Sequence, residues 1–208
     1  MRSLILNIIL FIAEVIGLTW SMVEQNHFLD FKFYTNLSNV LAMFASLLYI
    51  IYYFKKNAFL NNVMLYLKMI STIGLLITFL TVIFVLGPNG ASKNGFKGYL
   101  EYLFPHGLLF LHVLCPIIGV ISFTKFESNK KLDNKWFYIL ACLYTFVYGI
   151  LVITFVYYKQ ISAPYFFLDS VKMGYLKTFL FGLIFVGFSG LLAYLLVFVN
   201  KKIYKESI

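Results

Sequence analysis

Two histidines lie at one end of an apolar run that is long enough to cross a membrane. His106 directly follows Pro105, where a helix would begin, and His112 lies deeper in the run, four residues before Pro116. Ionisable side chains at membrane depth are rare and usually face a bundle interior or a wet cavity. The position of His112 therefore predicts a functional site, with a plain hydrogen bond to a neighbouring helix as the alternative. We expect His106 to lie at headgroup level or to cap the helix.

A second polar patch opens another apolar run, which is expected to be helical from residue 33 to residue 54. Thr35, Asn36, Ser38 and Asn39 occupy four of five consecutive positions. Thr35, Ser38 and Asn39 have i, i+3 and i+4 spacing, so they share one helix face. Capping alone does not explain so many polar side chains. The patch indicates either a site or hydrogen bonding between helices, which small polar residues commonly provide in membranes.

Three further groups are candidates for the same site. Glu14 is an acid in the middle of the first apolar run, where it must be protonated, paired or exposed to an internal cavity. Tyr144 and Tyr148 are one helical turn apart and either line a cavity with hydroxyls or pack as aromatics. Residues 164–169 place a proline and an acid, Asp169, around aromatic residues between the last two apolar runs. We expect this segment to form a lid or rim over the site.

The composition predicts that these candidates lie in a membrane. Of the 208 residues 62% are hydrophobic and 12% are charged, against roughly 50% and 25% in soluble domains. The formal charge of +9 would suggest nucleic acid as a partner of a soluble protein. Here the lysines cluster beside apolar runs, so we expect anionic lipid headgroups and no nucleic acid. Cys115 and Cys142 lie inside apolar runs and are expected to pack as small residues, so no metal and no cofactor is predicted.

The apolar runs predict an all-α fold, a bundle of six transmembrane helices forming a single domain over residues 1–208. Each run reaches the roughly 20 residues that a bilayer requires. We expect Lys68, near one end of the third run, to extend to the nearer surface. Pro116 should kink the fourth helix and free a carbonyl that a neighbour or water must satisfy. The runs cover residues 3–23, 33–54, 63–86, about 105–123, 136–158 and 176–199.

The segments between the runs predict the orientation. Lysine and arginine are more frequent on the side that holds both termini, so we expect a cell-membrane protein with both termini in the cytoplasm. Thr35, His112 and residues 164–169 then lie toward the outer half of the bilayer. The glycine-rich segment 87–104 is expected to be a loop, and it lacks the G-K-S/T ending of a phosphate-binding loop.

Three stretches together resemble one family, the androgen-induced or FAR-17a membrane proteins of animals and their bacterial relatives. They are Phe-Lys-Phe-Tyr-Thr at residues 31–35, His-Val-Leu-Cys-Pro at residues 112–116, and Pro-Tyr-Phe-Phe-Leu-Asp at residues 164–169, followed by Gly174. The animal members are intramembrane threonine hydrolases that cleave fatty acid esters of hydroxy fatty acids. The resemblance implies that Thr35 is the nucleophile and His112 its partner. The proline after the histidine is one residue nearer in this chain, and Leu-Ser-Asn at residues 37–39 matches the bacterial branch.

The chemistry that such a pair requires predicts the roles of its neighbours. A threonine hydroxyl is a poor nucleophile until a base takes its proton, and a neutral imidazole suits that task. No acid lies near His112 in sequence, so Glu14, Asp169 or a backbone carbonyl must orient the ring. Asn36, Asn39 and the tyrosines are candidate donors to the oxyanion. We expect the substrate to be a lipid or acyl ester whose long chain enters the site sideways from the membrane.

Two other functions fit the same residues. An acyltransferase would pass the acyl group to an alcohol instead of water. A non-enzymatic transporter or lipid-binding protein would use Glu14, His112 and the tyrosines to line a polar pathway, although the sequence has no internal repeat of the kind that transporters often show. The sequence gives no indication of the oligomeric state.

Overall fold

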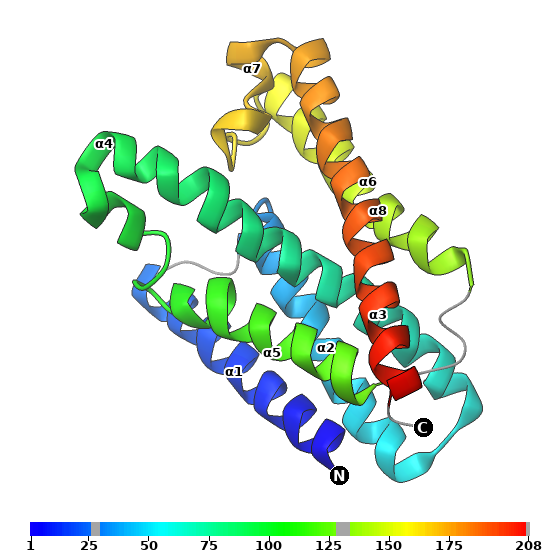
Figure 1. Cartoon of the computed structure of the whole chain (residues 1–208). Helices are drawn as coiled ribbons and strands as arrows, with labels where there is room; N and C mark the ends of the chain where they lie inside the picture. Colours follow the sequence, from blue (N-terminus) through cyan, green and yellow to red (C-terminus); the bar gives the residue numbers. More distant parts are fainter. Residues whose placement is uncertain (26–29, 128–133, 207–208) are drawn as a thin grey trace.

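The computed structural model describes residues 1–25, 30–127 and 134–206. The described residues form helices and no strands, which confirms the predicted all-α bundle (Figure 1). Six helical segments of the described chain are long and apolar enough to cross a membrane. They are α1 (Arg2–Gln25), α2 (Tyr34–Lys55), α3 (Ala58–Thr81) with its continuation, a fourth segment centred on α5 (Cys115–Ile121), α6 (Trp136–Tyr157) and α8 (Tyr175–Glu206).

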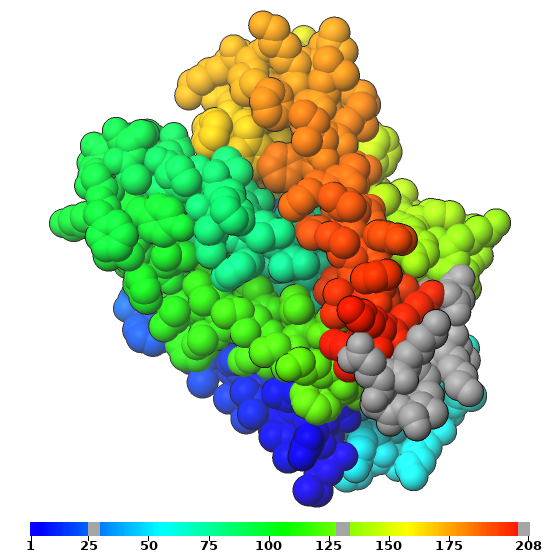
Figure 2. Space-filling model, in the orientation of Figure 1, coloured from blue at the N-terminus to red at the C-terminus, as the bar shows by residue number. Residues whose placement is uncertain are grey.

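The alternating direction of the helices gathers the candidate residues at one end of the bundle. The two chain termini lie together at the opposite end, as Figure 1 shows. Two short helices, η5 (Phe166–Leu168) and α7 (Ser170–Met173), connect α6 to α8 at the candidate end. In the space-filling view this end is divided into two projections, one formed by α4 and the other by α7 with the adjoining ends of α6 and α8 (Figure 2).

The third segment is longer than predicted, because the expected loop at residues 87–104 is mostly helical. The π-helical segment η1 (Val82–Leu86) continues α3 into α4 (Gly87–Leu100). The chain reverses within α4, where Gly95 has a φ of 62°, and Gly98 then packs against Gly90. A Cβ added to Gly98 would lie 2.3 Å from the Gly90 carbonyl oxygen. The glycines therefore serve a close contact between two backbones, and the loop prediction is wrong.

The fourth segment begins later than predicted. Residues 101–107 form turns, and helix starts at the π-helical segment η2 (Leu109–Leu114), followed by α5 and by η3 (Ser122–Phe126). His106 lies in the turn with a φ of 54°, so it does not begin the helix. Its Nδ1 lies 2.5 Å from the Glu24 carboxylate at the end of α1.

The hydrogen bonds around Pro116 explain how α2 is attached to this segment. The Cys115 N–H bonds to the Phe110 carbonyl, which is the i→i−5 pattern of a π-helix. In that pattern the next residue would donate to the Leu111 carbonyl, but Pro116 has no N–H. The Asn39 side-chain amide donates to the Leu111 carbonyl instead, at 3.3 Å. The prediction that a neighbour satisfies a carbonyl freed by Pro116 is confirmed.

Pro88 creates the same situation in the third segment. The Gly87 N–H bonds to the Val82 carbonyl, so Pro88 leaves the Ile83 carbonyl without a backbone donor. The Tyr99 hydroxyl donates to that carbonyl at 3.2 Å. The π-helical segments η1 and η2, each followed by a proline, are thus completed by a side chain from elsewhere in the fold.

Lys68 belongs to a buried polar cluster near the chain termini. Its ammonium lies 3.2 Å from the Glu127 carboxylate and donates to the Asn7 side-chain oxygen at 2.8 Å. The Asn7 amide and the Ser122 hydroxyl both donate to the same carboxylate. Lys68 is only 1% exposed, so the prediction that it reaches the nearer surface is wrong. A charged partner on another segment makes burial of its charge tolerable.

Candidate active site

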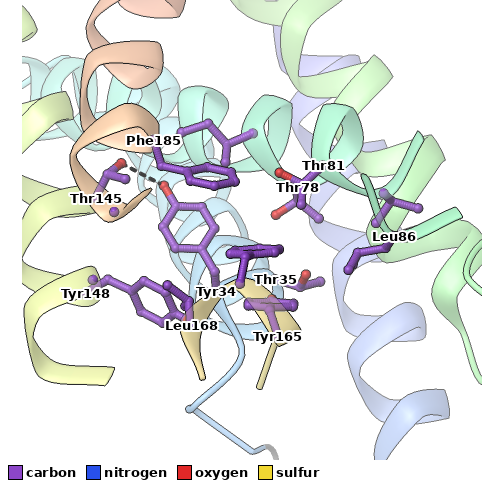
Figure 3. A pocket seen from close by; sticks show the side chains of 15 residues that line it. Tyr34, Thr35, Thr78, Thr81, Leu86, Thr145, Tyr148, Tyr165, Leu168 and Phe185 are labelled. Atoms are coloured by element: carbon purple, nitrogen blue, oxygen red, sulfur yellow. Dashed lines mark hydrogen bonds between the residues drawn. The ribbon is translucent and has the colours of Figure 1, made fainter. Parts of the chain in front are cut away.

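A cavity lies between α2, α3, α6 and α8, and η5 and the residues before it close one side (Figure 3). Its free volume is about 50 Å³, which is space for water or for one functional group of a larger ligand. The lining is mostly apolar. Its polar members are seven hydroxyl-bearing side chains and no charged group: Tyr34, Thr35, Thr78, Thr81, Thr145, Tyr148 and Tyr165.

Thr35 lies in the first turn of α2, with its hydroxyl directed into this cavity (Figure 3). The N-cap residue Phe33 makes no side-chain capping bond, and Thr35 itself is half-buried. Its side chain interacts with the Tyr165 hydroxyl, and burial raises the pKa of the Tyr165 phenol. Tyr165 therefore keeps its proton at neutral pH and is available as a hydrogen-bond donor next to the candidate nucleophile.

His112 is 7% exposed, in the middle of η2. Its Nδ1 lies 2.6 Å from the Tyr102 backbone carbonyl oxygen. A carbonyl only accepts hydrogen bonds, so Nδ1 must carry the proton and donate it. In the neutral ring Nε2 is then the free acceptor, which is the form that a general base requires. Of the three expected ways to orient His112, the structure uses a backbone carbonyl.

The structure joins the Thr35 and His112 regions through Asn39. The Asn39 amide donates to the Thr35 carbonyl at 2.8 Å and to the Leu111 carbonyl at 3.3 Å. The turn of α2 that carries the threonine is thereby held against the residue preceding the histidine. Between Thr35 and His112 themselves, both within the described chain, there is no direct hydrogen bond, and His112 does not line the cavity.

The other candidates on α2 and α6 take part in hydrogen bonds between segments. The Asn36 amide donates to the Asp30 carbonyl at 3.0 Å, so it holds the turn before α2. The Tyr144 hydroxyl bonds to Ser38 at 3.2 Å, and the Tyr148 hydroxyl donates to the Lys32 carbonyl at 2.6 Å. Tyr148 lines the cavity, whereas Tyr144 and Asn36 do not.

The two acids lie outside the cavity lining. The Asp169 carboxylate accepts a hydrogen bond from the Lys172 backbone N–H and so caps α7. Burial alone would raise the pKa of Asp169, but the hydrogen bonds and charge of Lys172 outweigh burial and hold the pKa below its usual range. Residues 165, 167 and 168 of the expected rim do line the cavity. Glu14 is fully buried beside Cys115, and neither carboxyl oxygen has a hydrogen-bond partner of normal geometry.

A groove of about 810 Å³ runs between α2, α3 and α6. Exposed apolar residues one turn apart on α6, Leu143, Val147 and Leu151, form one wall. Asp30 and Lys32 lie at the polar end, and Tyr148 lines both the groove and the cavity. The groove therefore adjoins the cavity at one shared side chain.

Sequence reasoning missed the α3 wall of the cavity. Thr78 and Thr81 were not selected, although their i, i+3 spacing places both hydroxyls on one face of an apolar helix. The same spacing rule selected Thr35, Ser38 and Asn39 on α2. Comparison of the chain with protein-family models, with curated proteins and with solved structures finds no match.

Proposed function

We propose that this protein is an intramembrane hydrolase of lipid esters in which Thr35 is the nucleophile and His112 is the general base. The observation that carries the proposal is the hydrogen bond from His112 Nδ1 to the Tyr102 carbonyl at 2.6 Å. This bond leaves Nε2 as the basic nitrogen of the ring. Asn39 links the segment that carries His112 to the turn that carries Thr35, because its amide donates to both backbones. Thr35 in turn supplies a hydroxyl to a small, largely apolar cavity.

The proposed reaction proceeds in two steps. The Thr35 oxygen attacks the ester carbonyl carbon, and its proton passes to His112 Nε2 while the carbonyl electron pair moves onto oxygen. When the tetrahedral intermediate collapses, the ester C–O bond breaks and the leaving alcohol takes the proton from His112. Water then attacks the acyl-threonine in the same way and releases the acid. Because the two side chains share no direct hydrogen bond, proton transfer uses a bridging water or a side-chain rotation on substrate binding.

The two hollow regions suggest how a long substrate is accommodated. A cavity of about 50 Å³ admits the ester group but not a whole acyl chain. The adjoining groove of about 810 Å³ has an apolar wall and charged residues at one end. In the proposal the chain lies in this groove, and the ester passes Tyr148 to reach Thr35. The substrate class is accordingly an ester of a long-chain acid, with fatty acid esters of hydroxy fatty acids as one instance.

The proposed location is the cell membrane, with both termini in the cytoplasm. Six apolar helices are compatible with a multi-pass protein, and the orientation rests on the distribution of lysine and arginine. Single cysteines at Lys93 and at Lys56 test it by labelling with a membrane-impermeant maleimide on intact cells. Labelling at position 93 and protection at position 56 supports the orientation, and the reverse pattern contradicts it.

The activity is tested by reacting the purified protein with an alkyl fluorophosphonate, which labels activated serine and threonine hydroxyls. Wild-type labelling at Thr35, located by mass spectrometry of the labelled peptide, supports the proposal. The same protein is then given a lipid ester with and without an added long-chain alcohol. Formation of a new ester in preference to free acid would assign acyl transfer. Absence of labelling and of turnover, with the ester bound, would instead favour a lipid-binding protein.

A further inference from the structure

Thr78 has a buried hydroxyl with no hydrogen-bond partner. The residue is 3% exposed on α3, and its Oγ1 is without a donor or acceptor within bonding distance. Leaving such a group unpaired costs about 1–3 kcal/mol. The hydroxyl lines the cavity and is directed into it, as is that of Thr81 one turn further along α3 (Figure 3).

Other buried threonines in this fold show what a structural hydroxyl does. In a membrane helix a threonine commonly donates to the carbonyl one turn before it. Thr124 donates to the Val120 carbonyl at 2.7 Å, and Thr178 donates to the Gly174 carbonyl at 3.0 Å. Thr78, like Thr178, lies in an α-helix with a carbonyl one turn before it, but it makes no such bond. Its hydroxyl is directed away from its own backbone and toward the cavity.

Three other hydroxyls of the cavity, those of Tyr34, Thr145 and Tyr148, are already engaged in hydrogen bonds. Thr145 donates to the Ala141 carbonyl at 3.4 Å, so it accepts from the Tyr34 hydroxyl at 3.1 Å. Tyr148 donates its only hydroxyl proton to the Lys32 carbonyl. On the α3 wall, across the cavity from Thr35, Thr78 retains a proton that it can donate to a ligand (Figure 3).

We propose that the Thr78 hydroxyl donates a hydrogen bond to the acyl carbonyl oxygen of the substrate and to the oxyanion that forms from it. This inference rests on the proposed function, because it uses Thr35 as the attacking group. It makes Thr78 a catalytic residue on α3. The group that binds at this wall of the cavity is then an acyl carbonyl. The bond strengthens as negative charge develops on that oxygen, so Thr78 acts on the transition state more than on substrate binding.

The test replaces the hydroxyl without changing the shape of the side chain. Thr78→Val, Thr78→Ser, Thr35→Ala and the control Thr178→Val are assayed in detergent with p-nitrophenyl octanoate. We expect Thr78→Val to lower kcat about 100-fold, the lower end for loss of one oxyanion donor, with KM within twofold of wild type. Thr78→Ser should recover most of kcat, and Thr178→Val should keep it. Thermal unfolding of each variant is measured in parallel, and Thr78→Ala carries the same test if Thr78→Val does not fold.

Each outcome decides between the two proposals. Wild-type kcat in folded Thr78→Val, together with an inactive Thr35→Ala, overturns the role of Thr78 and leaves the proposed function standing. The hydroxyl would then only hold water. A kcat loss that Thr78→Ser does not recover also overturns the role, because it would reflect cavity shape. Full activity in Thr35→Ala overturns the proposed function and the role of Thr78 with it.

Discussion

The two polar regions buried in this bundle differ in how fully their hydrogen-bonding groups are satisfied. Near the chain termini, the Glu127 carboxylate receives Lys68, Asn7 and Ser122 at once. At the opposite end, the cavity contains the unpaired Thr78 hydroxyl. A fully satisfied network fixes the packing of helices, whereas unpaired groups beside free space are available to a ligand. The first region is expected to govern stability and the second to govern activity.

The largest expected effect is a loss of activity when residues of the candidate site are replaced. Thr35→Ala and His112→Ala should each lower ester hydrolysis on the order of 10⁴-fold or more, and the double variant should cost little more because the groups act as a unit. Thr35→Ser should keep part of the activity, since it retains the hydroxyl. Fluorophosphonate labelling and turnover are the measurements. His106→Ala is the control and should have a smaller effect, because His106 pairs with Glu24 outside the cavity. Retained hydrolysis in either alanine variant would contradict the pairing.

The next largest effect is on stability, from the cluster around Glu127. Lys68→Met leaves a buried carboxylate without its cation and should destabilise the fold by about 3–5 kcal/mol. The double variant Lys68→Met/Glu127→Leu should recover most of this loss. Lys172→Met is the matched control: it breaks a pair with Asp169 whose lysine is 84% exposed, so it should cost about 1 kcal/mol or less. Equal midpoints for Lys68→Met and Lys172→Met in unfolding experiments would show that the cluster is not a stabilising one.

A smaller effect is expected where α1 contacts η2. A Cβ on Gly17 would lie 2.8 Å from both the Phe110 Cβ and a methyl group of Leu111. Gly17→Ala should therefore cost about 1–3 kcal/mol through overpacking and should also reduce turnover, since η2 carries His112. Gly187→Ala is the control, because nothing lies within 4 Å of its added Cβ. A Gly17→Ala protein as stable and active as Gly187→Ala would mean that η2 adjusts without moving the histidine.

The smallest effect concerns the cap of α7. Asp169→Ala should destabilise this short connection by about 1 kcal/mol, and Asp169→Asn by less, because asparagine also caps. Although Asp169 lies outside the cavity, its cap fixes the connection whose residues 165, 167 and 168 line the cavity, so Asp169→Asn should alter turnover or substrate preference with similar folded yield. Since the pKa of Asp169 is lowered in the fold, its contribution is present above the unfolded pKa of about 3.9 and disappears as pH falls through the folded value. The hydrogen-exchange protection factors of residues 170–174, which are corrected for the pH dependence of intrinsic exchange, should therefore be unchanged down to about pH 4 and fall below it. A loss of protection already near pH 6 would assign the effect to another group.

Hydropathy was sufficient to predict six helices, because each forms a long, predominantly apolar run in which a helix satisfies its own backbone hydrogen bonds. It was insufficient for Lys68, whose carboxylate partner is Glu127, 59 positions along the chain. The loop prediction at residues 87–104 failed because glycines that mark a turn in a soluble chain here permit two backbones to touch.

The candidate site was predictable only in part. Thr35 was accessible to reasoning because polar residues clustered visibly around it. The acceptor of His112 is a main-chain carbonyl, that of Tyr102, and every residue has one, so no side-chain signal identifies it. Thr78 and Thr81 share a helix face, but they give a weak signal because threonines in an apolar helix usually bond to their own backbone. Only the fold reveals that Thr78 does not.

The proline that interrupts the fourth segment has a consequence for the order of assembly. A helix inserts into the bilayer before it associates with others, and an unpaired carbonyl facing hydrocarbon costs several kcal/mol. On its own, the fourth segment would expose the Leu111 carbonyl that Pro116 leaves without a donor. Docking onto α2 supplies that donor from Asn39. The segment that carries His112 is therefore most stable in the bilayer only once the segment that carries Thr35 is in place, so maturation of the site is coupled to correct pairing of the helices.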